Sequence, residues 1–226
     1  MNTPIWWQHL VWIMAAGGLG FAIAALFAGW LRLPRRLFLI PYVGLSAVFL
    51  TAYTLWSEID LLALLADNWA WGVLAGTLVG AITVANVRSQ PATRQSDGGE
   101  LLADLAWLGL AYGLVDGLFL NVMPVLAVWN GLESLGWNGS WAGRIGAGAL
   151  ALGASLFVAL AYHVGYPEFR NRRVGLVLVG NGLITLAFLF SGNPLGAIIA
   201  HVVMHLAAVL RGPDTTVQLP PHPAAS

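Results

Sequence analysis

The sequence contains no cysteine and no lysine, and charged residues make up only 9% of its 226 positions. Without cysteine, the chain has no disulfide, no thiolate metal site and no cysteine nucleophile. Without lysine, it has no retinal Schiff base, no catalytic lysine and no Walker-type phosphate loop. The formal net charge is zero, and no basic stripe indicates nucleic-acid binding. Soluble domains carry roughly 25% charged residues, so this chain has too few polar groups to cover a surface in water.

Hydrophobic residues are abundant instead, at 58% of the chain. Crossing the hydrocarbon core of a bilayer takes about 20 apolar residues in a helix. The N-terminal stretch "MNTPIWWQHL" lacks the positive region of a signal peptide, so we expect a retained first span. The pattern predicts an all-α, polytopic membrane protein, a bundle of seven transmembrane helices. Their ranges are 5–31, 37–56, 69–87, 102–129, 141–163, 174–190 and 195–210.

The arginines orient this bundle. Nine of the ten fall on one side of the seven-span plan, and only Arg144 falls on the other. Because arginine-rich loops stay in the cytoplasm, we expect the N-terminus outside and the C-terminus inside. Arginine in place of lysine, with much Ala, Gly and Leu, is typical of a high-GC bacterial genome, which suggests the inner (plasma) membrane. The sequence thus predicts a membrane domain over 1–212, followed by a Pro-rich cytoplasmic tail over 213–226. We expect this tail to be mostly unstructured.

Four ionisable side chains stand out in these spans: Asp116, His163, His201 and His205. Such groups are costly in a bilayer, so they usually face the bundle interior and serve a function. Rise along the helix places Asp116 about 20 Å from the cytoplasmic end of its span, beyond the midplane. A carboxylate there either joins two helices as a packing group or acts chemically.

The helix that carries Asp116 has two further features. Glycine recurs every four residues along it, at Gly109, Gly113 and Gly117. Small residues at this spacing let another helix approach closely, so Asp116 should flank a packed seam. Eight residues after the aspartate, Pro124 leaves the carbonyl of Leu120 without its helical donor and favours a bend.

His201 and His205 lie four residues apart, so both imidazoles project from one helix face about 6 Å apart, as in zinc sites on helices. Rise along the last span places them about 10 Å and 16 Å below the outer surface, near the depth of Asp116. If the protein is an enzyme, we expect Asp116, His201 and His205 to hold one divalent metal, with zinc as the first candidate. His163 comes about 15 Å nearer the cytoplasm by the same arithmetic, either as an interfacial histidine or as a catalytic partner of Asp116.

The order of these residues resembles the CPBP (CAAX-protease-and-bacteriocin-processing) family of intramembrane proteases. That family carries a glutamate pair and an arginine (EExxxR), then FxxxH, then HxxxN or HxxxD. Here "DGLFLN", from Asp116 to Asn121, occupies the first frame, and "ALAYH" ends on His163. "NPLGAIIAHVVMH" is similar to the last motif, with His205 where the family has Asn or Asp. The resemblance implies a hydrolase in which the acidic residue and the histidines activate water, with or without metal.

A second group, the progestin/adiponectin receptors and alkaline ceramidases, also places HxxxH in the last of seven spans. Its other zinc ligands come from early spans, and spans 37–56 and 69–87 of this chain lack both of them. Because these two spans lack the ligands, the resemblance to the CPBP family is preferred.

Three interpretations follow from the sequence. The first is a metal-dependent hydrolase or protease acting on a membrane-embedded peptide or lipid. The second is a non-catalytic membrane protein, such as a degenerate family member, an immunity-like protein or a small transporter, in which the same residues form a packing or proton-relay network. The third is haem ligation by two histidines, for instance His9 with His201.

Overall fold

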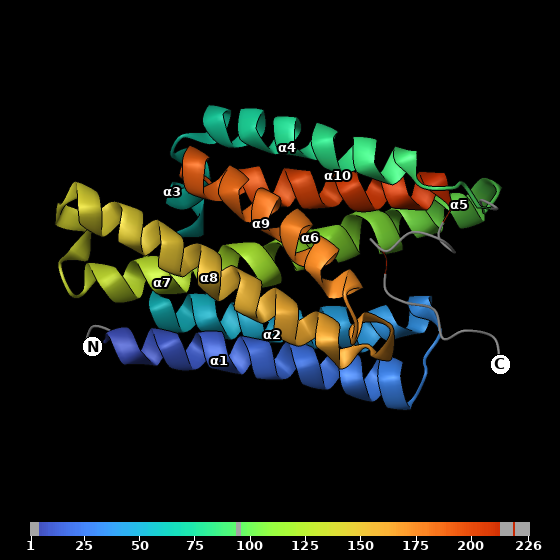
Figure 1. Ribbon diagram of the computed structural model, residues 1–226, viewed down its shortest axis with the longest axis horizontal. Helices are drawn as coiled ribbons and strands as arrows, with labels where there is room; N and C mark the ends of the chain where they lie inside the picture. The colour runs from blue at the N-terminus through green and yellow to red at the C-terminus, as the bar shows by residue number, and fades with distance from the viewer. Residues whose placement is uncertain (1–4, 94–95, 213–218, 220–226) are drawn as a thin grey trace.

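The computed structural model describes residues 5–93, 96–212 and 219, and these residues form helices and connecting loops without a strand. The prediction of an all-α fold is thereby confirmed. Figure 1 shows the long helices lying roughly along one axis, while α9 crosses its neighbours obliquely. The long helices are α1 (Trp6–Ile23) with its continuation η1 (Ala24–Trp30), α2 (Arg35–Ser57), α4 (Trp69–Ser89), α8 (Trp141–Gly165), α9 (Arg173–Ser191) and α10 (Leu195–Arg211). The short elements are α3 (Leu61–Ala66), η4 (Trp137–Gly139) and η5 (Pro167–Phe169).

A single long helix, Gly98–Glu133, occupies the centre of the bundle and is called the central helix below. In its most apolar window, 78% of the residues are buried, against 28–33% in the other long helices. It alternates between α-helical and wider π-helical turns, which are frequent at functional sites. The segments are α5 (Gly98–Asp104), η2 (Leu105–Ala111), α6 (Tyr112–Asp116), η3 (Gly117–Val122) and α7 (Met123–Glu133).

Six helices in the described part of the chain are long and apolar enough to cross a membrane, and they correspond to the first six expected spans. The seventh expected span, 195–210, corresponds to α10, an apolar helix of 17 residues. Many large apolar side chains lie on the outer surface, among them Leu55 at 74% exposure and Phe190 at 85%. A surface of this kind is typical of helices that face lipid.

Two glycine stripes hold α10 in the interior. The stripe that we predicted on the central helix packs against α10, and a second stripe on α4 packs against the same helix. A Cβ added at Gly76 would lie 2.9 Å from Cβ of Ile199, and one at Gly80 would lie 2.6 Å from Cγ2 of Val203. Because these contacts leave no room for a side chain, α10 lies closer to both neighbours than larger residues would allow.

The carbonyl freed by Pro124 receives a new donor from another helix. Pro124 is the second residue of α7, and the hydroxyl of Ser155 on α8 donates to the carbonyl oxygen of Leu120 at 2.7 Å. Side chains of neighbouring helices commonly satisfy backbone groups that a proline releases in a membrane helix. This contact is consistent with the prediction that Pro124 leaves the carbonyl of Leu120 without its helical donor. It also joins the central helix to α8.

The tail predicted over 213–226 lies outside the described residues, with the exception of Leu219. That side chain is 2% exposed and packs against the hydrophobic core.

Candidate metal centre

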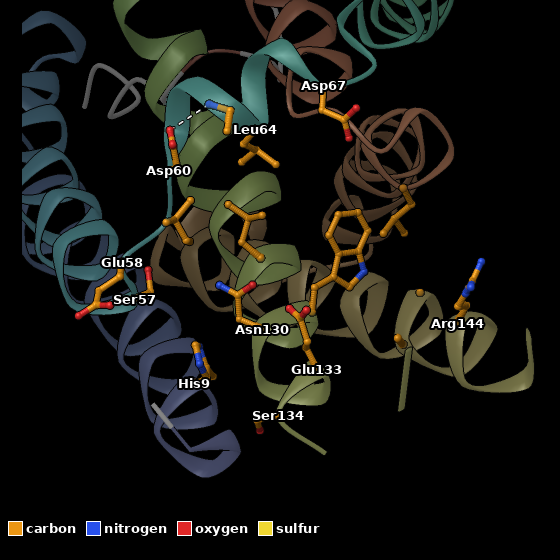
Figure 2. A pocket seen from close by; sticks show the side chains of 17 residues that line it. His9, Ser57, Glu58, Asp60, Leu64, Asp67, Asn130, Glu133, Ser134 and Arg144 are labelled. Carbon is orange, nitrogen blue, oxygen red and sulfur yellow. Dashed lines mark hydrogen bonds between the residues drawn. The ribbon is translucent and has the colours of Figure 1, made fainter. Parts of the chain in front are cut away.

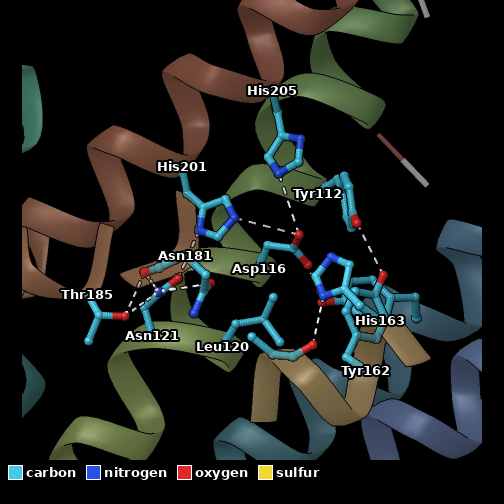
Figure 3. Close-up of polar contacts among 12 residues, drawn as sticks. Tyr112, Asp116, Leu120, Asn121, Tyr162, His163, Asn181, Thr185, His201 and His205 are labelled. Carbon is cyan, nitrogen blue, oxygen red and sulfur yellow. Dashed lines mark hydrogen bonds and ion pairs between the residues drawn. The ribbon is translucent and has the colours of Figure 1, made fainter. Parts of the chain in front are cut away.

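Asp116 and the two histidines of α10 lie together in the centre of the bundle (Figure 3). Asp116 is the last residue of α6, and the histidines lie one turn apart on α10. Nε2 of His205 is 3.5 Å from Oδ2 of Asp116, and Nε2 of His201 is 3.8 Å from the same oxygen. All three side chains are at most 5% exposed. The structure thus unites the three residues that the sequence placed at one depth.

This meeting depends on the glycines that flank Asp116. A Cβ at Gly113 would lie 2.8 Å from Cα of Val202, and one at Gly117 would lie 3.3 Å from Cα of Ile198. The backbone of α10 therefore runs directly against the helix that carries the aspartate. Any larger residue at either position would push α10, and with it both histidines, away from the carboxylate.

Asn121 determines which nitrogen of His201 carries the proton. The amide nitrogen of Asn121 donates to the carbonyl oxygen of Asn181 at 3.3 Å and to the hydroxyl of Thr185 at 2.8 Å. Its oxygen Oδ1 therefore faces Nδ1 of His201, at 2.9 Å, and can only accept. In the neutral ring Nδ1 of His201 is then the donor, and Nε2 carries the lone pair on the side of Asp116. Metal-binding histidines are oriented in this manner by a hydrogen bond from their other nitrogen.

Tyr42 supports the aspartate from the opposite side. Its hydroxyl, on α2, donates to Oδ1 of Asp116, and the tyrosine is fully buried. The bond occupies one carboxylate oxygen and leaves Oδ2 to face the two histidines. Asp116 thus presents a single, fixed oxygen to the site.

His205 has no hydrogen-bond partner for either ring nitrogen in the part of the chain that the structure describes. Its ring lies parallel to that of His201, with centroids 5.2 Å apart, and 4.6 Å from the ring of Tyr112. Buried polar atoms are nearly always paired. Nε2 faces Oδ2 of Asp116 at 3.5 Å without a hydrogen bond, so an ion between these two atoms would give both a partner.

The three groups together fit a divalent metal. One ligand atom from each residue lies within 4.8 Å of the others. Ligands bound at about 2.0–2.1 Å in a tetrahedron lie about 3.3 Å apart. The two distances from the histidines to Asp116, 3.5 Å and 3.8 Å, are a few tenths of an ångström longer, and the widest separation in the group closes by more when an ion binds. The lone pair on His201 and the carboxylate of Asp116 face one another, and a cation between them removes their repulsion. Two imidazoles and one carboxylate form a donor set that suits zinc.

A cavity of about 260 Å³ adjoins these residues and is lined by Asp116, His201 and His205 as well as by His163. Nδ1 of His163 lies 2.7 Å from the carbonyl oxygen of Ala159, which can only accept, so Nε2 of His163 carries the lone pair. Helical rise placed His163 nearer the cytoplasm than Asp116. It nevertheless shares their cavity, because the cavity extends along α9 as far as Leu176, near the start of that helix.

Three tyrosines form a hydrogen-bonded chain beside the site. The hydroxyl of Tyr166 donates to that of Tyr162 at 2.5 Å, and the hydroxyls of Tyr162 and Tyr112 are 3.1 Å apart. Burial raises the pKa of the Tyr166 phenol, in the loop after α8, well above its ordinary value. This phenol therefore stays protonated and serves as the donor at one end of the chain. Tyr112, at the other end, lies one helical turn before Asp116 and lines the cavity.

Sequence reasoning missed several of these supporting residues. It placed Asn121 only at the end of the first family frame, and it did not single out Tyr42 or Tyr112. The spacing of Tyr112 and Asp116, four residues apart on one helix, was the one available signal. It also missed Asp104, a buried carboxylate that binds Nε of Arg36 at 2.7 Å, away from the three-residue group.

His9 lies in a different part of the molecule. It lines a larger cavity of about 1250 Å³, together with Glu58, Asp60 and Glu133 (Figure 2). Its Nδ1 is 3.4 Å from the hydroxyl of Tyr53. Since the residues lining this cavity do not include His201, the two histidines do not share a space for a haem, and the haem interpretation gains no support.

Comparison of the chain with protein-family models, with curated proteins and with solved structures gives no match. The resemblance to the CPBP family therefore stays a prediction from the motifs.

Proposed function

We propose that this protein is a zinc-dependent hydrolase whose site lies within the membrane. The observation that carries the proposal is the convergence of Asp116, His201 and His205, in which Nε2 of His205 faces Oδ2 of Asp116 at 3.5 Å without forming a hydrogen bond. An ion-binding interpretation accounts for the approach of both Nε2 atoms to one oxygen of Asp116 and for the orientation of His201 by Asn121. A group held only for packing needs neither feature.

The proposed topology is a bundle of seven spans with the N-terminus outside, in the plasma (inner) membrane of a bacterium. Support comes from the arginines. Helix α8 starts at the left end of Figure 1 and carries Arg144 in its first turn. No other arginine that the structure describes lies in the first turn of a helix starting at that end. The α1–α2 and α8–α9 connections, which carry further arginines, lie in the right half of the same view. The positive side therefore corresponds to one end of the bundle.

The proposed chemistry is hydrolysis, in which water adds to an acyl carbon and the bond to the leaving group breaks. A divalent ion held by Asp116, His201 and His205 would supply Lewis-acid activation of water and of the carbonyl. His163 presents the lone pair of Nε2 to the same cavity, so it can accept the proton of the attacking water and return it to the leaving group. Tyr42 and Asn121 hold Asp116 and His201 in place during both steps.

The alternative is a non-catalytic protein in which these residues relay protons. The hydrogen-bonded chain of Tyr112, Tyr162 and Tyr166 beside Asp116 favours it, because linked hydroxyls can pass a proton along. The two functions differ in their dependence on metal, since a relay through hydroxyls, imidazoles and a carboxylate requires none.

The proposal is tested with protein reconstituted in vesicles and supplied with ester, amide and peptide bonds, with products read by mass spectrometry. Cleavage should require zinc and should disappear in Asp116→Asn. The matched control is Asp104→Asn, which alters the other buried aspartate of the central helix. Cleavage that persists in Asp116→Asn, or that proceeds equally after zinc is removed, would refute the hydrolase.

A further inference from the structure

The cavity beside Asp116 reaches the outer surface of the bundle. Its lining includes Ile82 of α4 and Leu176 and Val179 of α9, which are 56%, 74% and 64% exposed. At its inner end lie Asp116 and His205, both 2% exposed. The cavity therefore connects a buried polar site with the apolar surface between α4 and α9, where a membrane protein meets lipid.

Two polar groups along this passage are bonded within the protein. The hydroxyl of Thr83 donates to the carbonyl oxygen of Gly80 at 2.9 Å, and Nδ2 of Asn181 donates to the hydroxyl of Ser155 at 3.2 Å. Leu219 lines the same passage and is 2% exposed, so the passage accommodates an aliphatic group of the chain itself. The walls thus favour a ligand that is apolar over most of its length.

We infer that the substrate is an acyl lipid, with an ester or amide bond, whose aliphatic chain enters from the bilayer between α4 and α9. The inference rests on the proposed hydrolase and names its substrate class. The acyl chain would lie between Ile82 and Val179, and the carbonyl at its end would reach Asp116 and the histidines. Hydrolysis would break the bond between the acyl carbon and the oxygen or nitrogen of the headgroup, and water would supply the oxygen of the released acid and the proton of the leaving group.

The chemistry of the passage favours an acyl chain over a transmembrane peptide. A peptide in an extended form would carry N–H and C=O groups that need partners, and a bilayer does not supply them. An acyl chain carries no such groups and fits a narrow apolar passage.

Gly180 offers a way to close the passage without disturbing the fold. It lines the cavity, and a Cβ added there meets no atom within 4 Å. Gly175, on the same helix, also meets no atom within 4 Å but is not among the residues that line the cavity. Gly180→Trp should therefore fill the passage, whereas Gly175→Trp adds the same indole to α9 at a neutral position. Gly180→Leu provides a smaller plug should the indole prevent folding, which thermal unfolding reports for each variant.

The test uses a phosphatidylcholine with a diazirine in its acyl chain, diluted in vesicles of ether-linked phosphatidylcholine. After irradiation, mass spectrometry compares labelling of cavity residues on α4 and α9 with labelling of the exposed face of α8 around Leu150, which reports surrounding lipid. We expect this ratio to fall about 5-fold or more in Gly180→Trp, because an indole fills the opening, and to stay unchanged in Gly175→Trp. Equal ratios in the two variants, or labelling of the outer faces alone, would overturn the inference.

The two proposals fail in different ways. If the wild type binds zinc but its cavity takes up no label, the acyl-lipid assignment falls and the metal centre stands. If the cavity is labelled and closed by Gly180→Trp while the protein holds no zinc, the lipid site stands and the hydrolase falls.

Discussion

Oδ1 of Asn121 accepts a hydrogen bond from Nδ1 of His201 at 2.9 Å, across the interface between the central helix and α10. This contact directs the other nitrogen of His201 at Asp116. Asp116 and Asn121 are five residues apart, and the π-helical turn η3 starts directly after the aspartate. Because a π turn bonds residue i to residue i+5, it brings both side chains toward α10. The aspartate and the residue that orients its histidine thus come from one irregular turn.

Asn121→Leu should weaken zinc binding by about 10–100-fold, because His201 loses the partner that fixes its tautomer and its ring orientation. Competition with a calibrated zinc chelator measures the affinity. Asn130→Leu, on the same central helix but in the lining of the larger cavity, is the control and should bind zinc as the wild type does. Unchanged affinity in Asn121→Leu would show that the contact does not orient a ligand.

Tyr42→Phe removes the hydroxyl that holds Asp116, and we expect zinc affinity to fall about 10-fold, as for other groups that support a metal ligand. Tyr53→Phe is a matched control, since Tyr53 is a buried tyrosine of the same helix whose hydroxyl contacts His9 instead. Equal losses in the two variants would assign the effect to helix packing rather than to Asp116.

Gly113→Leu should separate α10 from the central helix, because the backbone of α10 already lies 2.8 Å from the position of its Cβ. Overpacking of this kind lowers the free energy of unfolding by about 1–3 kcal/mol and should also abolish zinc binding. Thermal unfolding in detergent, with zinc removed, isolates the packing effect. Gly153→Leu on α8 projects into open space and should leave both properties intact. A stable, zinc-binding Gly113→Leu variant would contradict the close approach.

Ser155→Ala leaves the carbonyl of Leu120 without its donor and should cost about 1 kcal/mol of stability, as buried hydrogen bonds in membrane proteins do. In a Pro124→Ala background the restored N–H can bond to that carbonyl, so the same substitution should cost less. A double-mutant cycle of unfolding free energies measures the difference. The hydroxyl of Ser155 also lies 2.7 Å from that of Thr185 and accepts a hydrogen bond from Asn181. Identical costs in both backgrounds would mean that Ser155 acts through these partners and not through Leu120.

Hydropathy and residue spacing predicted the parts of this fold that depend on local pattern. The positions of the long helices follow from apolar runs. The glycine stripe at Gly109, Gly113 and Gly117 predicted a close contact with another helix. The depth of Asp116 and of the two histidines, estimated from helical rise, predicted their meeting. Each of these features needs only the chain and a fixed rise per residue.

The supporting residues could not be found in this way. Whether Tyr42 faces Asp116 depends on how α2 is rotated about its axis, which one sequence does not reveal. Asn121 reaches His201 only because the central helix widens into a π turn, and a regular α-helix would point it elsewhere. The place of His163 on the cavity wall depends on how far the cavity extends between α8 and α9. These outcomes arise from packing between helices, not from the pattern along any one of them.

Zinc content per chain tests the central claim most directly. Protein purified in detergent from zinc-supplemented cells is analysed by inductively coupled plasma mass spectrometry, beside Asp116→Ala, His205→Ala and the control His9→Ala. We predict about one zinc per chain in the wild type and in His9→Ala, and almost none in the other two, as expected for a site with three protein ligands. A wild type without stoichiometric metal, or zinc that survives loss of both Asp116 and His205, would contradict the metal centre.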